Sequence, residues 1–391
     1  MKIDFDSSRL DCPFYNDHHK HFREWVVRPF VKNEIMPYVD QWEEAGNLPA
    51  ELFVKAAKAG LFQIGYPECY GGVSKDIDIF HTLIIGEELA RCGAGGVYSS
   101  LCVHAIGLPP VVHFASEELK QQVVPPVIKG EKHIALAITE PSGGSDVGNL
   151  QTIAKKVGDH YVVNGVKTFI TGGFRADWFT AAVRTGGDGI DGISLLLIPA
   201  NLEGVTRSSV GKKQGWLCSE TATIYFDQVK VPVKNIIGVE NQGFKPIVNN
   251  FNNERMGMVA ACVGFSRVCL EEAGKWARER QTFGKSLSKH QVIRHKFSEM
   301  LRQINATQCY MELCGWQIKN GSVNPADISM LKVQATMTME FCAREASQIM
   351  GGMSYVRECR TERIYREVRV MAIGGGSEEI MRDLASRQMG L

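Results

Sequence analysis

Residues 136–148 read Leu-Ala-Ile-Thr-Glu-Pro-Ser-Gly-Gly-Ser-Asp-Val-Gly and join a strand-like run to a loop of small residues. The run that ends here, from His133 to Ile138, is short and β-prone, which predicts a strand. Gly143 and Gly144 fit an ordinary turn, and they also lack the side chains that would keep a backbone away from a bound cofactor. The stretch therefore marks both the end of a strand and a candidate binding loop.

The surrounding region, from 131 to about 235, keeps this strand-like pattern. Its β-prone runs are short and end at Gly, Asn or Asp, as expected for strands joined by turns. Asn164-Gly165 separates two of the runs, and because both residues tolerate positive φ, the pair predicts a hairpin turn. We therefore expect a small antiparallel β-domain with strand-like runs at 133–138, 160–163, 167–171, 193–198, 221–226 and 229–233.

Both flanks of this region have a helical pattern. In the N-terminal flank, Phe22, Val26 and Phe30 recur at four-residue spacing, which is typical of one buried face of a helix. In the C-terminal flank the periodic segments are long, and long helices joined by short connections predict an antiparallel bundle. They cover roughly 244–280, 288–320, 325–350 and 377–389. The expected fold is α+β and mostly helical, with an N-terminal α-helical domain at 1–130, the β-domain at 131–240 and a C-terminal α-helical bundle domain at 241–391.

The composition restricts the class of protein. A chain of 391 residues is long enough for two or three domains. Its 44 Lys and Arg against 43 Asp and Glu give a net charge of +1, so neither a nucleic acid nor an anionic membrane is expected as the main partner. The 11 cysteines form no CxxC pair, which indicates reduced thiols and no metal site or disulfide framework.

The sequence also carries no obvious membrane or targeting signal. It has no run of about 18 apolar residues, so we expect no membrane span. The first residues, Met-Lys-Ile-Asp-Phe-Asp-Ser-Ser, are acidic and lack an apolar core, unlike a secretory signal or an Arg-rich transit peptide. The expected location is a bacterial cytoplasm, or the mitochondrial matrix if the chain is a processed eukaryotic form.

One carboxylate lies on an apolar stripe of the helix expected at 244–280. Ile247, Phe251, Met258 and Cys262 share one face at spacings of three and four, and Glu254 falls on the same face. A buried carboxylate without a partner is costly, so its presence has to be explained. A structural ion pair is one explanation. A general base is the other, because burial raises the pKa of a glutamate towards neutrality.

Five segments of the chain resemble motifs of the acyl-CoA dehydrogenase family. They occur in the order of the family and span nearly the whole chain, so the resemblance is more specific than any single motif. The family fold is an α-helical domain, a β-barrel-like domain and a four-helix bundle, the same order that the periodicity predicts. The segments are Thr139 to Asp146 (T-E-P-x-x-G-S-D), Lys167 to Gly173, Arg280 to Lys285 with the trailing Gln291, Gln348 to Gly352, and Ile373 to Arg382.

The resemblance implies FAD as the cofactor. Residues of the β-domain would contact its isoalloxazine ring: Leu136, Ile138, Thr139, Phe169 and Thr171. Polar groups and glycines, some of them from a neighbouring subunit, would hold its pyrophosphate and adenosine half: Arg280, Phe283, Gln291, Gln348, Gly351, Gly352, Ser377 and Glu379. Simple structural roles are the alternative, with Phe169 as a strand core residue, Gln348 as a surface amide and Arg280 as a solvated charge.

The sequence departs from the commonest family pattern at the position of the catalytic base. Most members carry that glutamate in the C-terminal segment, where this chain has Gly375, and Glu378 and Glu379 lie beyond the matching position. A subset, which includes the isovaleryl-CoA and long-chain enzymes, has the base on a bundle helix instead. There it matches Glu254, so the resemblance implies that the glutamate on the apolar stripe is the base.

The implied reaction is the α,β-dehydrogenation of an acyl-CoA thioester to the trans-2-enoyl-CoA. Glu254 would take the α proton while the β hydride passes to N5 of FAD, and the N–H of Gly375 would stabilise the developing enolate. Ser145 and Arg255 would contact the substrate. Gly374 replaces a bulky Tyr, so a branched acyl chain is expected in preference to a straight medium or long chain.

The resemblance also implies partners. The electrons would pass to an electron-transfer flavoprotein, and the chain would form a homotetramer built as a dimer of dimers. Two alternatives remain on the same fold: an oxidase that uses oxygen, on an acyl-CoA or a nitroalkane, and a non-catalytic FAD-binding member. Glu254 argues against the nitroalkane enzyme, which is expected to use an Asp as its base. Glu254 and the set of cofactor residues together argue against the non-catalytic member.

Overall fold

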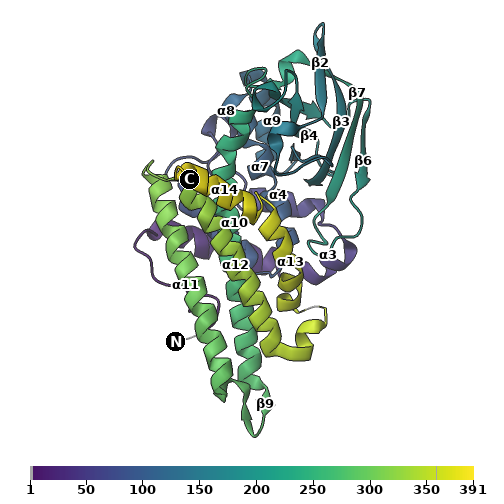
Figure 1. Ribbon diagram of the computed structural model, residues 1–391. Helices are drawn as coiled ribbons and strands as arrows, with labels where there is room; N and C mark the ends of the chain where they lie inside the picture. Colours follow the sequence, from purple (N-terminus) through teal and green to yellow (C-terminus); the bar gives the residue numbers. More distant parts are fainter. Residues whose placement is uncertain (1–2, 358) are drawn as a thin grey trace.

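The computed structural model describes residues 3–357 and 359–391, and only the backbone of residues 249 and 250. A helical region, a strand region and a second helical region follow one another along the chain, which confirms the predicted fold (Figure 1). The N-terminal region consists of α1 (Asp17–His21), the π-helical segments η1 (Phe22–Val27) and η2 (Val31–Ile35), α2 (Arg28–Phe30), α3 (Val39–Ala45), α4 (Ala50–Lys58), α5 (Ile79–Ala90), α6 (Gly95–Cys102), α7 (His104–Gly107), α8 (Pro109–Phe114) and α9 (Glu117–Ile128).

The middle region is an eight-stranded sheet in the order β6-β7-β3-β2-β4-β5-β8, with β1 beside β4. Most neighbouring strands are antiparallel, but β1 and β2 run parallel to β4. The strands are β1 (Ile134–Ala137), β2 (Ile153–Val157), β3 (His160–Thr171), β4 (Trp178–Arg184), β5 (Ile193–Pro199), β6 (Val205–Ser209), β7 (Thr221–Pro232) and β8 (Ile236–Ile237).

The predicted hairpin at Asn164-Gly165 is wrong, because β3 continues through both residues. The turn between β2 and β3 lies earlier, at Gly158, whose φ is 60°. The Asn164 side-chain Oδ1 accepts the Gln228 backbone N–H at 2.9 Å, where the register between β3 and β7 shifts. A Cβ at Gly165 would lie 2.4 Å from Thr152 Oγ1. The pair therefore forms a bulge that lets β2 approach β3 closely.

The C-terminal region is a bundle of long helices (Figure 1). A short hairpin of β9 (Gln281–Thr282) and β10 (Lys285–Ser286) joins its first two helices at the end remote from the sheet. The third helix packs against all the others. The helices are α10 (Phe244–Glu279), α11 (Gln291–Lys319), α12 (Pro325–Met350), α13 (Arg360–Ile373) and α14 (Glu378–Gln388).

Helix α10 connects the sheet to the bundle. Near its start, Ile247 is buried in a cluster with Leu195 and Ile237 of the sheet. From Met256 onward, its buried side chains belong to the core shared by the bundle and the N-terminal helices. Glu254 therefore lies where α10 passes from one region to the other.

Helices α6 to α8 form a bent apolar segment. Gly95–Cys102 and His104–Phe114 together have the required length and composition, but they are bent against each other by 43°. No single helix in residues 3–357 and 359–391 meets both criteria.

Candidate active site

The Glu254 carboxyl group is held in an environment that favours its neutral form. Its Oε2 atom is buried and has no hydrogen-bond partner among the described residues. Burial raises the pKa of Glu254 to about 7, although the positive charges of Arg255 and Lys332 act in the opposite direction. A carboxyl group with a pKa near 7 can both accept and release a proton at neutral pH.

The loop between α13 and α14 brings Gly375 next to this carboxyl group. A Cβ built on Gly375 would lie 4.0 Å from Glu254 Oε1, and the Arg255 Nε donates to the Gly375 carbonyl at 3.1 Å. Gly375 and Gly376 have φ values of 67° and 107°, which side chains rarely permit. Gly374 precedes them at the end of α13. The structure thus gathers Glu254, Arg255, Gly374 and Gly375, as the sequence predicts.

The predicted ring-binding residues meet on the sheet. The carbonyl of Thr139, just after β1, accepts the Thr168 N–H of β3 at 2.9 Å, which brings 136–139 beside 168–171. Phe169 is 67% exposed and has a φ of 57°, at an irregularity in the pairing of β3 with β7. An exposed aromatic ring on a strained backbone needs an explanation, and such strain is concentrated at functional sites. Ile138 is buried, whereas Leu136 and Thr171 are half-buried.

A buried ion pair fixes the loop that carries Ser145, and sequence reasoning missed it. Lys167 Nζ lies 2.7 Å from Glu140 Oε1 and donates to the Ile138 carbonyl at 3.1 Å. Glu140 also accepts the backbone N–H groups of Gln151 and Thr152, at 2.6 and 2.9 Å. Glu140 and Lys167 both lie within family motifs, which was the only sign of their importance in the sequence. Neither the periodicity nor the spacing of the residues indicates that the two side chains form an ion pair.

A cavity of about 620 Å³ opens beside the start of α10. Arg184 links two loops near this cavity. Its guanidinium donates to the carbonyls of Gly148 and Leu150 in the first loop and to those of Gly187 and Gly189 in the second. The first loop carries Ser145, which is exposed. The lining residues are Ile190, Asp191, Asn241, Gln242, Phe244, Lys245, Val248 and Asn252. The cavity thus reaches Asn252, two residues before Glu254 on α10, and Glu254 itself is not among the lining residues.

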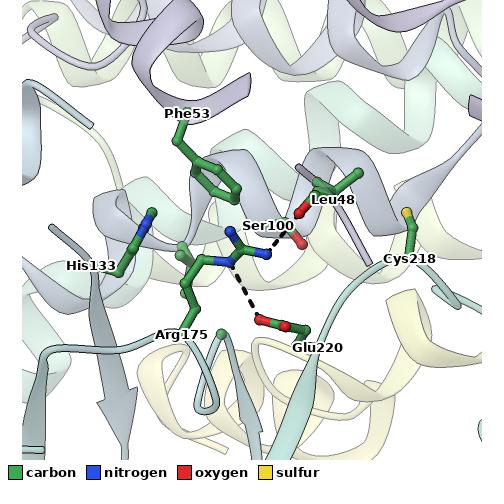
Figure 2. Close-up of a pocket in the computed structure, with 9 residues that line it drawn as sticks. Leu48, Phe53, Ser100, His133, Arg175, Cys218 and Glu220 are labelled. Atoms are coloured by element: carbon green, nitrogen blue, oxygen red, sulfur yellow. Dashed lines mark hydrogen bonds and ion pairs between the residues drawn. The ribbon is translucent and has the colours of Figure 1, made fainter. Parts of the chain in front are cut away.

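A second cavity, shown in Figure 2, is a packing junction. Its volume of about 10 Å³ is close to the minimum for one water molecule. Arg175 points across it and donates to the Glu220 carboxylate at 3.3 Å and to the Leu48 carbonyl at 2.7 Å. Burial lowers the pKa of His133 to about 4, so this ring stays neutral near pH 7. None of the predicted site residues lines this cavity.

The remaining predicted cofactor residues lie elsewhere in the chain. Arg280 ends α10, and from Glu254 to that point the helix rises about 39 Å at about 1.5 Å per residue. Phe283 lies in the β9–β10 hairpin and is 96% exposed. Exposed Gln291, Gln348, Gly351 and Gly352 lie at the first turn of α11 and the end of α12, while Ser377 caps α14 and exposed Glu379 lies in its first turn. One chain therefore does not bring Arg280 or Phe283 to Phe169 and Glu254.

Comparison with known proteins gives the same family over the whole chain. Models of the acyl-CoA dehydrogenase N-terminal, middle and C-terminal domains match residues 16–131, 135–229 and 241–390. Acyl-CoA dehydrogenase AFT10-1 of Alternaria alternata is 39% identical, over 95% of this chain and 91% of that protein. The mitochondrial long-chain specific acyl-CoA dehydrogenase of Rattus norvegicus is 31% identical, over 96% and 87%.

Solved structures agree with these relatives. The crystal structure of a probable acyl-CoA dehydrogenase from Mycobacterium abscessus superposes with a TM-score of 0.93 at 40% identity, covering 96% of this chain and 100% of that one. Since the family models and the full-length relatives together cover all three regions, the chain belongs to the acyl-CoA dehydrogenase family of FAD-dependent oxidoreductases.

Proposed function

We propose that the chain converts an acyl-CoA thioester into the trans-2-enoyl-CoA, with Glu254 as the base. The observation that carries this proposal is the buried, unpartnered Oε2 of Glu254 beside the Gly375 backbone. No lysine, arginine or histidine among the described residues forms an ion pair with Glu254, so a structural ion pair does not account for its burial. The carboxyl group is therefore available to a substrate.

The residues on β1 and β3 fit a flat cofactor such as FAD. Phe169 exposes its ring although its positive φ costs free energy, which is understandable if the ring contacts a bound partner. Thr139 and Thr171 supply hydroxyl groups from the two neighbouring segments, 136–139 and 168–171. Bound FAD supplies the acceptor for the hydride that leaves the β carbon.

The proton step belongs to the chain itself. Glu254 removes the α proton, and its pKa of about 7 matches neutral pH. The N–H of Gly375 stabilises the negative charge that develops on the thioester oxygen, as a fixed backbone donor does in other acyl chemistry. Arg255 holds the Gly375 carbonyl and so fixes the orientation of this part of the loop.

The cofactor site is completed by a second subunit in this proposal. Arg280 and Phe283 are remote from Phe169 within one chain, and Phe283 is almost fully exposed. In a symmetric oligomer, Arg280, Phe283, Gln291, Gln348, Gly351 and Gly352 of one chain reach the FAD of its neighbour, while Ser377 and Glu379 contact the adenosine half. We propose a homotetramer made of two such dimers.

The substrate is an acyl-CoA with a branched chain, with straight medium and long chains as the alternatives. Gly374 carries no side chain beside the reacting carbons, and its nearest neighbours are the Val370 carbonyl and Met258. Ser145 would contact the pantetheine chain. An electron-transfer flavoprotein is the proposed electron acceptor. Relatives occur in bacteria and in mitochondria, and the bacterial cytoplasm or the mitochondrial matrix stays the predicted location.

The test is an anaerobic titration of the purified holoprotein with isovaleryl-, octanoyl- and palmitoyl-CoA, followed through the flavin absorbance band. Bleaching by isovaleryl-CoA at the lowest concentration, with enoyl-CoA as product, is expected. Preferential bleaching by palmitoyl-CoA would overturn the branched-chain assignment. Fast reoxidation of the bleached protein in air would identify an oxidase, and no bleaching by any of the three would contradict the dehydrogenation.

A further inference from the structure

Lys332 of α12 is a fully buried lysine whose ammonium group contacts no carboxylate among the described residues. It donates instead to two backbone carbonyls, that of Ala372 at 3.0 Å and that of Gly376 at 2.7 Å. Burying a charged group without an opposite charge is costly. For Lys332 the fold accepts that cost beside the loop that carries Gly375.

The two accepting carbonyls lie on either side of Gly375. The Gly375 carbonyl between them accepts from Arg255 Nε at 3.1 Å. Cations from α10 and α12 therefore hold the carbonyls of a loop whose glycines have positive φ. Each peptide unit is planar, so these bonds fix the units that begin at Ala372, Gly375 and Gly376. The unit that carries the Gly375 N–H, between Gly374 and Gly375, lies between fixed neighbours, because the Gly374 N–H also donates to the Val370 carbonyl at 2.8 Å.

The charge of Lys332 also acts on Glu254. The ionisable groups that face Lys332 are Cys262, Glu254 and Arg255 of α10, together with Glu378 and Glu379 of α14. The positive charges of Lys332 and Arg255 both act to lower the pKa of Glu254, and so favour the carboxylate that takes the proton. The same two charges favour the negative charge that then appears on the substrate.

We propose that Lys332 is a positioning residue for the dehydrogenation, which holds the Gly375 N–H towards the thioester oxygen and stabilises ionised Glu254. This inference rests on the proposed function. The simpler interpretation is that Lys332 only caps the last turn of α13, where helix carbonyls lack partners. A capping role alone would affect stability and leave the chemistry of Glu254 unchanged, so the two roles can be separated.

The test uses Lys332→Met in the holoprotein, with Lys296→Met as the matched control. Lys296 lies on α11, where it pairs with Glu345 of α12, so the control removes another lysine that contacts α12. For Lys332→Met we expect kcat to fall about 10- to 100-fold with little change in KM. The acid limb of the kcat/KM profile should move upward by on the order of one pH unit, because Glu254 loses a stabilising charge. The control should show neither effect.

An unchanged kcat and an unchanged acid limb in Lys332→Met would overturn the proposal and leave Lys332 as a helix cap. Glu254→Gln, measured alongside, keeps this outcome distinct from failure of the proposed function, which would appear as full activity of that variant. If Lys332→Met yields no folded holoprotein, Lys332→Gln decides. It keeps a donor but loses the charge, so the acid limb must still move upward, and an unmoved limb overturns the proposal.

Discussion

The Met258 thioether occupies the space that a side chain on Gly375 would need. A Cβ built on Gly375 would lie 2.7 Å from Met258 Sδ, closer than real Cβ contacts allow. The positive φ of Gly375 adds backbone strain to this clash. In this chain a glutamate at the loop position would therefore have to displace Met258 and adopt a strained backbone, whereas α10 already places the Glu254 carboxyl group beside Gly375.

Moving the base back to the loop should accordingly fail. We expect Glu254→Gln/Gly375→Glu to stay within about tenfold of Glu254→Gln in the rate of flavin bleaching, because the new side chain displaces Met258 and strains the backbone. Adding Met258→Ala to this pair makes room and should raise the rate. Recovery of a tenth or more of the native rate in the first double variant would contradict the packing argument.

The pKa of Glu254 predicts a pH dependence of activity and of stability. The base must be ionised, so kcat/KM should rise with pH through an apparent pKa of about 7. The folded-state pKa lies above the unfolded value, so the stabilisation from neutral Glu254 is complete at acidic pH and is lost as pH rises through about 7. Glu254→Gln, which stays neutral, should therefore raise the melting temperature at pH 8 and have little effect at pH 4.5. Equal shifts at both pH values would contradict the raised pKa.

We expect Phe169 to strengthen FAD binding and to lower the stability of the FAD-free protein. We expect Phe169→Gly to stabilise the FAD-free protein by about 1 kcal/mol, because it relieves a positive φ and exposes little new surface. The same variant should bind FAD at least tenfold more weakly. The control is Asp76→Gly, which relieves a φ of 58° in the N-terminal region and should leave FAD affinity unchanged. Denaturant unfolding and flavin fluorescence titration measure the two effects, and native FAD affinity in Phe169→Gly would exclude the ring contact.

Sharing of the active site between subunits predicts complementation. Glu254→Gln and Arg280→Ala chains should each be inactive alone. When they are co-expressed and assemble at random, one of the two sites in each mixed dimer combines native Glu254 with native Arg280, so about a quarter of native activity should return. If both residues served a site within one chain, mixing would restore nothing.

Much of the fold can be predicted from the sequence, because apolar residues that repeat at helical spacing over a long segment identify a helix and its buried face. The apolar stripe of α10 both predicted the helix and identified Glu254 as misplaced on it. The hairpin prediction at Asn164-Gly165 failed because the tolerance of positive φ that suits a turn equally suits a bulge. Thr152, just before β2, decides between the two, and it lies against Gly165 only in the folded structure.

The buried lysines of the site could not be predicted in the same way. Lys167 meets Glu140, and Lys332 meets the Ala372 and Gly376 carbonyls, only when separate elements pack together. No periodicity links residues so far apart in sequence.

The contacts of Ser354 could not be predicted from the sequence either. Its hydroxyl donates to the carbonyls of Ser347 and Gly351 at 2.9 Å each, which closes the turn after α12.

The most direct test of Glu254 as the base is the rate of flavin reduction in Glu254→Gln under anaerobic single-turnover conditions. The comparison is made with FAD fully bound and with the acyl-CoA that reduces the native protein fastest. We predict a rate at least 1000-fold below native, on the order expected when a base is removed, with substrate binding retained. A rate within tenfold of native would contradict the assignment of Glu254 as the base, and Glu378 and Glu379 would become the next candidates.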